Sequence, residues 1–202
     1  MKITSKILQR ADVILFLFIT LLAIFKGQAT VFYIVYLFWF QEFIRTMIDL
    51  SYLLIKKKRS TEKILEIRSA FSNFFLMFIY WVFIVVTFGL ILNFSNKNLL
   101  RENILIFLFR NWYFNSSLLL FAIQHLIYRF SLKNKEVSIV VFNRRHIILH
   151  LSILLGAVVQ HFLVPKLPID QNAWMSVFVI LPFLLLKLFL DRDYETSKED
   201  NK

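Results

Sequence analysis

Long apolar stretches, separated by short polar connections, dominate the pattern of hydrophobic and polar positions along the chain. A helix needs about 20 apolar residues to cross the ~30 Å hydrocarbon core of a bilayer. The pattern predicts six transmembrane helices, at residues 11–25, 31–55, 71–94, 112–130, 145–164 and 173–191, and then a charged tail at 192–202. None alternates as a membrane β-strand does, so we expect an all-α polytopic membrane bundle forming one integral-membrane domain over residues 1–202.

Two shorter features complete this topology. The run from Ile104 to Phe109 is too short to cross, so the stretch from Asn98 to Asn111 is predicted to be an interfacial helix that leads into the fourth span. The first apolar stretch resembles a signal peptide, with a weak cleavage site at residues 27–29. Lys26 directly precedes that site and argues against cleavage, so the first helix is expected to be retained.

The basic residues predict the orientation of the bundle. Seventeen Lys and Arg fall at the N-terminus, after the second and fourth spans, and in the tail, whereas the remaining connections hold only five. Basic residues gather on the cytoplasmic side of membrane proteins. Both termini are therefore predicted to be cytoplasmic, in a multi-pass membrane protein.

Composition supports the membrane class and excludes others. Of the 202 residues 58% are hydrophobic and 18% charged, and the mean hydropathy is +0.65. With no cysteine there is no disulfide, thiolate metal site or cysteine nucleophile. The net charge of +11 is explained by basic cytoplasmic connections, so no nucleic-acid partner is expected.

A few ionisable residues inside the predicted spans require an explanation, because each costs about 3 kcal/mol to insert. In the second span Glu42 and Asp49 share one helix face, and Arg45 reaches both at spacings of three and four residues. Such a group either neutralises itself and orients the helix, or forms a polar site facing other helices. Both interpretations place the group toward the bundle interior.

Polar residues on three other predicted spans lie at a similar depth. His125, His150 and Lys187 each lie about 6–8 Å inside the cytoplasmic boundary, and Lys187 has Asp191 four residues later. We therefore expect one intramembrane polar cluster, in which Glu42 accepts hydrogen bonds from Arg45, His125 or His150. Lys187 would pair with Asp191 or with a carboxylate of the second span.

No known catalytic motif accompanies this cluster, so no catalytic residue is assigned. Zinc-protease, phosphate-loop and nucleophile-elbow patterns are absent from the sequence. Histidines on separate helices are able to ligate haem, and carboxylates with histidines are able to hold a metal. The sequence does not decide whether a metal binds, and no cofactor is predicted.

Several short stretches are similar to one bacterial family. Phe38–Glu42, Gln124-His125, Arg145–Gly156 and Leu186–Asp191 match, in order and spacing, the signatures of the inner-membrane family known as domain of unknown function 6498. The third span of that family carries histidines, whereas Phe74–Gly89 has none. The resemblance implies a membrane bundle in the inner membrane and implies no activity.

Three functions follow as hypotheses, and the sequence leaves open whether the chain is an enzyme. The first is a non-enzymatic accessory subunit that contacts the bilayer and other membrane subunits or a second copy of itself. The second is a small transporter for protons, ions or small molecules that uses the Glu, His and Lys side chains of the cluster. The third is a haem- or metal-binding redox protein.

Overall fold

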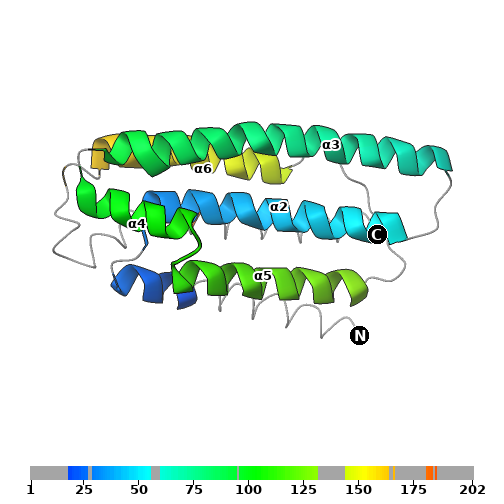
Figure 1. Cartoon of the computed structure of the whole chain (residues 1–202), viewed down its shortest axis with the longest axis horizontal. Coiled ribbons are helices and arrows are strands. Elements are labelled where there is room, and N and C mark those ends of the chain that lie inside the picture. Colours follow the sequence, from blue (N-terminus) through cyan, green and yellow to red (C-terminus); the bar gives the residue numbers. More distant parts are fainter. Residues whose placement is uncertain are drawn as a thin grey trace.

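The computed structural model describes residues 18–26, 29–55, 60–94, 96–131, 144–163, 166, 181–183 and 185, and these ranges contain helices and no strand. Residues 18–25 form a first helical segment, drawn in dark blue in Figure 1. The labelled helices are α2 (Val31–Ile55), α3 (Ser60–Phe83), α4 (Lys97–Phe107), α5 (Trp112–Ser131) and α6 (Arg144–Val158). π-Helical turns at Ile84–Leu90 and Val159–Leu163 continue α3 and α6 respectively.

Helix α2 is the centre of the bundle. It contacts α3, α5 and α6, and Figure 1 shows it running between α5 and the pair formed by α3 and α6. All nine residues from Val31 to Trp39 are buried, because this half of the helix has neighbours on every side. The indole Nε1 of Trp39 donates a 2.7 Å hydrogen bond to the carbonyl of Met77 and ties α2 to α3.

Among the described residues, three segments are long and apolar enough to cross a membrane: Val31–Ile55, Ile64–Asn93 and Lys97–Ile127, the last containing α4 and most of α5. Burial separates them, since 67% of the apolar window of Val31–Ile55 is buried, against 22% and 33% for the other two. Most exposed residues of α3 and α5 are large and apolar, and they include Phe71, Phe75, Phe78, Val82, Leu119, Ile123, Leu126 and Phe130. Such outward apolar faces are those of a membrane protein.

The predicted spans agree with the helices in most places and differ in one. The second, fourth and fifth spans correspond to α2, α5, and α6 with its π-helical extension, and the expected interfacial segment contains α4. The third helix begins at Ser60 and not near Phe71, since polar residues continue the helix outside the apolar stretch. Residues 18–25 of the first predicted span are described and helical, whereas most of the sixth span and the charged tail lie outside the described residues.

The end of the third helix is irregular, and buried amides stabilise it. A π-helical turn leaves backbone carbonyls without their usual helical donors. The Phe88 carbonyl accepts hydrogen bonds from Asn93 Nδ2 at 2.6 Å and from Asn103 Nδ2 at 3.1 Å. Asn103 also accepts a 2.8 Å hydrogen bond from the Thr30 hydroxyl. One α4 side chain thus joins the start of α2 to the end of the third helix.

A tight reversal joins α4 to α5. Phe109 has φ of 56°, and the N–H groups of Phe109 and Arg110 donate to the carbonyls of Ile106 and Leu105, which is the Schellman arrangement at a helix C-terminus. Asn111 then caps α5 by accepting a 3.0 Å hydrogen bond from the Phe114 N–H. These local contacts explain why the chain turns here.

Candidate functional site

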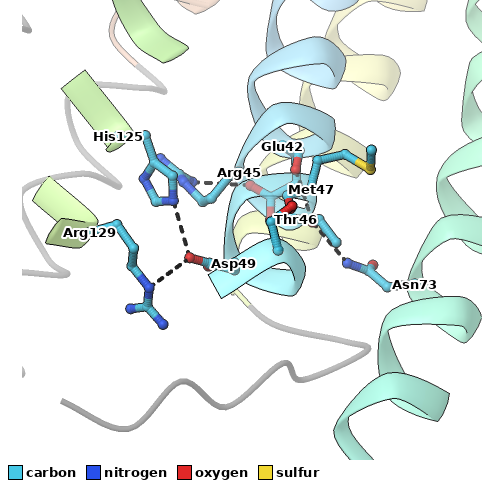
Figure 2. Close-up of polar contacts among 9 residues, drawn as sticks. Glu42, Arg45, Thr46, Met47, Asp49, Asn73, His125 and Arg129 are labelled. Atoms are coloured by element: carbon cyan, nitrogen blue, oxygen red, sulfur yellow. Dashed lines mark hydrogen bonds and ion pairs between the residues drawn. The ribbon is translucent and has the colours of Figure 1, made fainter. Parts of the chain in front are cut away.

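Polar side chains gather around the C-terminal half of α2, where it lies between α3 and α5 (Figure 2). We call this group the polar cluster, and it consists of Glu42, Arg45, Thr46, Asp49, Asn73, His125 and Arg129. Four members come from α2, one from α3 and two from α5. The polar cluster therefore links α2 to both α3 and α5.

The first pair is internal to α2. Arg45 Nη1 donates to Glu42 Oε2 at 3.1 Å, with the Glu42 side chain 9% and the Arg45 side chain 21% exposed. A spacing of three residues brings the two groups together on one helix face. The Arg45 guanidinium also lies 5.2 Å from the Phe121 ring centroid on α5, a favourable cation–π position.

Toward α3 the contacts are neutral. The Thr46 hydroxyl donates to the Glu42 carbonyl at 2.9 Å, one turn back in the same helix. It accepts in turn a 3.2 Å hydrogen bond from Asn73 Nδ2 on α3. A hydroxyl both donates and accepts, so Thr46 connects the two helices without adding charge.

Toward α5 the contacts are charged and centre on Asp49. Its Oδ1 atom lies 3.3 Å from His125 Nε2 and 3.2 Å from Arg129 Nε. The His125 ring stacks on Phe121 with an interplanar angle of 5°, and the Arg129 guanidinium lies 4.8 Å from the Tyr52 ring centroid. Two basic side chains of α5, His125 and Arg129, thus share the Asp49 carboxylate of α2.

The formal charges of the polar cluster balance. Glu42 and Asp49 supply two negative charges, and Arg45 and Arg129 supply two positive charges. His125 adds a group that is able to gain a proton beside a carboxylate. This arrangement can hold helices together in a low-dielectric environment and can exchange a proton at one imidazole.

No group of three or more metal-ligating side chains occurs among the residues that the structure describes. A shallow apolar groove does lie on the outer face of α5, lined by Ile123, Leu126, Ile127 and Phe130. No polar-cluster residue lines it. The groove is therefore separate from the polar cluster.

Comparison of the chain with protein-family models, curated proteins and solved structures finds no match.

The structure brings together some of the predicted site residues and separates others. Glu42 contacts Arg45 as expected, whereas His125 contacts Asp49 and not Glu42. His150 does not join the polar cluster: it is exposed, and its Nδ1 lies 3.4 Å from the Tyr80 hydroxyl. The buried face of α6 is formed by Leu149, Ser152, Ile153 and Gly156, which directs His150 outward. Lys187 and Asp191 lie outside the described residues.

Three members of the polar cluster, Thr46, Asn73 and Arg129, were not predicted. Arg129 follows His125 by four residues and so shares its helix face, but its position at the end of an apolar span suggested a solvated cytoplasmic residue. Asn73 is a single amide in an aromatic-rich stretch, and it is only 2% exposed. Two sequence features pointed to the last two of these residues. Arg129 has helical spacing from His125, and Asn73 is a single amide among apolar neighbours.

Proposed function

We propose that this chain is a multi-pass protein of a bacterial inner membrane, with six spans and both termini in the cytoplasm. The outward apolar faces of α3 and α5 support a membrane location. The distribution of seventeen basic residues against five supports the orientation. The alternating direction of α2, α3, α5 and α6 in Figure 1 is compatible with successive crossings.

Within that membrane, we propose that the chain acts as a non-enzymatic accessory subunit of a larger membrane complex. The observation that carries this proposal is the charge balance of the polar cluster, whose carboxylates and guanidiniums pair with one another. Groups that neutralise each other stabilise helix association inside a bundle. The proposed role of the cluster is therefore to fix α2 against α3 and α5.

Mild-detergent extraction of the tagged full-length chain from its native membrane tests the subunit role. We expect native mass spectrometry to show a partner protein at constant stoichiometry across independent preparations. Repeated isolation of the chain alone, or of the chain with no constant partner, would contradict the role.

A transporter is the second candidate, and the His125–Asp49 contact favours it, because an imidazole beside a carboxylate inside a bundle can carry a proton. Flux assays in liposomes distinguish the two. If the chain is a transporter, the natural protein should show flux and His125→Asn should abolish it. Asn98→Ala, on the exposed face of α4, should leave the flux unchanged. The subunit role predicts no flux from either protein.

We also propose that the chain is a divergent relative of the family known as domain of unknown function 6498. The support is the spacing of the four matching stretches, two of which supply Glu42 and His125 to the polar cluster.

A further inference from the structure

Arg129 carries hydrogen-bond donors that its neighbours do not use. Its side chain is only 10% exposed, and its Nε pairs with Asp49 at 3.2 Å. Its Nε and Nη2 atoms are buried and have no hydrogen-bond acceptor in the described part of the chain, so the contact with Asp49 is an ion pair without a hydrogen bond. A buried guanidinium N–H without an acceptor is costly, so this edge of the side chain requires an oxygen-bearing partner.

The surroundings hold this edge in a fixed direction. Asp49 occupies the Nε side of the guanidinium, and the Tyr52 ring covers one face at 4.8 Å. Figure 2 shows the two terminal nitrogens of Arg129 pointing away from Asp49 and from the rest of the polar cluster. The planar fork is therefore oriented for a ligand outside the cluster.

We propose that Arg129, with Tyr52 stacked against it, forms a binding site for a phosphate group at this end of the bundle. A guanidinium fork matches two oxygens of a phosphate in a bidentate arrangement. The phosphate belongs either to the headgroup of an anionic phospholipid or to free inorganic phosphate.

Position and charge favour an anion here. Helix α5 ends at Ser131, two positions after Arg129, so the guanidinium lies near the end of the predicted fourth span, at the level of a membrane interface. The sequence continues from α2 into Lys56, Lys57, Lys58 and Arg59, and from α5 toward Lys133 and Lys135. Basic residues next to a span attract anionic lipid.

This site rests on the proposed membrane location and is independent of the subunit role, since it is measured on the isolated chain. The test uses the full-length chain in a neutral detergent and counts bound lipid by native mass spectrometry. The probes are phosphatidylglycerol and a glycosyl diacylglycerol with the same acyl chains, which lacks phosphate.

The matched variants are Arg129→Gln and Arg101→Gln, which remove one positive charge at opposite ends of the bundle. We expect phosphatidylglycerol to be retained over the glycolipid. Arg129→Gln should reduce that retention about fivefold, as for the loss of one cation near an anionic surface. Arg101→Gln should leave it unchanged. Equal retention of the two lipids, together with no effect of free phosphate, would overturn the site.

Two further measurements distinguish lipid phosphate from free phosphate and keep the test valid if a variant does not fold. Sodium phosphate, compared with sodium chloride at equal ionic strength, should raise the melting temperature of lipid-free protein only if free phosphate is the ligand. If Arg129→Gln does not fold, Arg129→Lys keeps the ion pair with Asp49 but loses the fork. Equal losses in Arg129 and Arg101 variants would show a general charge effect and contradict the proposal.

Discussion

The carboxylate of Asp49 holds two side chains of α5 through a single oxygen atom. Removing a carboxylate from such a site leaves cationic groups with weakened partners in a poorly hydrated environment, and that cost exceeds the net value of the original contact. Asp49 is therefore the residue of the polar cluster at which a small chemical change should have the largest effect.

The first prediction is that Asp49→Asn lowers the free energy of unfolding by about 2 kcal/mol, because Arg129 loses its counter-ion while the side-chain volume is preserved. Reversible unfolding in mixed detergent micelles measures the change. The control is Glu102→Gln on α4, which removes a half-buried carboxylate outside the polar cluster and should cost about 0.5 kcal/mol or less. Equal losses in both variants would contradict this role of Asp49.

The sequence alone predicts that this part of α2 is polar, but it does not predict which residues of other helices the polar side chains contact. The spacing of Glu42, Arg45 and Asp49 predicts their shared face, because helix geometry fixes it. The partner of His125 depends on how α5 is rotated and shifted against α2, and no local pattern in either helix contains that information. The same reason explains why the position of His150 on the exposed side of α6 does not follow from its own helix pattern.

Helix extent and membrane crossing are separate properties, and the third helix shows this. Hydropathy predicts the apolar stretch from about Phe71, but α3 begins at Ser60, because a helix continues through polar residues as long as its backbone bonds form. Where apolar stretch and helix coincide, as in α2, the bounds agree with the prediction at Val31 and Ile55.

The second prediction concerns the contact between α6 and the π-helical turn. A Cβ added at Gly156 would lie 2.9 Å from Phe88 Cε1, whereas one at Gly89 would lie 3.3 Å from Phe32 Cε2. Alanine gains about 1 kcal/mol of helix propensity at both positions, so comparing them isolates the clash. We expect Gly156→Ala to be less stable than Gly89→Ala by about 1–2 kcal/mol in detergent unfolding.

A companion variant checks the cause of that difference. Replacing Phe88 by Leu shortens the side chain that the new methyl group would meet. If the clash is responsible, Gly156→Ala should cost less in the Phe88→Leu background than in the natural chain. An unchanged cost would point to a cause other than the Phe88 ring.

The third prediction concerns the amide of α4. Asn103 is 1% exposed and joins Thr30 to the carbonyl of Phe88. Asn103→Ala should lower the free energy of unfolding by about 2 kcal/mol, because it leaves buried polar groups without partners. Asn98→Ala removes an exposed amide from the same helix and serves as the control. Hydrogen exchange should also increase at the end of the third helix in Asn103→Ala only.

The fourth prediction concerns the orientation of the whole bundle. The chain has no cysteine, so single cysteines report their side of the membrane without background. A cysteine at Lys57 should react with an impermeant maleimide only after the membrane is broken, whereas one at Asn98 should react in intact spheroplasts. Labelling of Lys57→Cys from outside, with Asn98→Cys protected, would reverse the orientation and overturn the positive-inside assignment.

The two kinds of ion pair around α2 also imply an order of events during synthesis. Arg45 is only three positions from Glu42, so this pair is complete as soon as α2 leaves the ribosome. The partners of Asp49 come much later, with His125 76 positions further along the chain. Until then Asp49 enters the translocon without its α5 partners, at a helix end where water is near. The local pair therefore assists insertion, and the distant one takes effect when α5 arrives and docks.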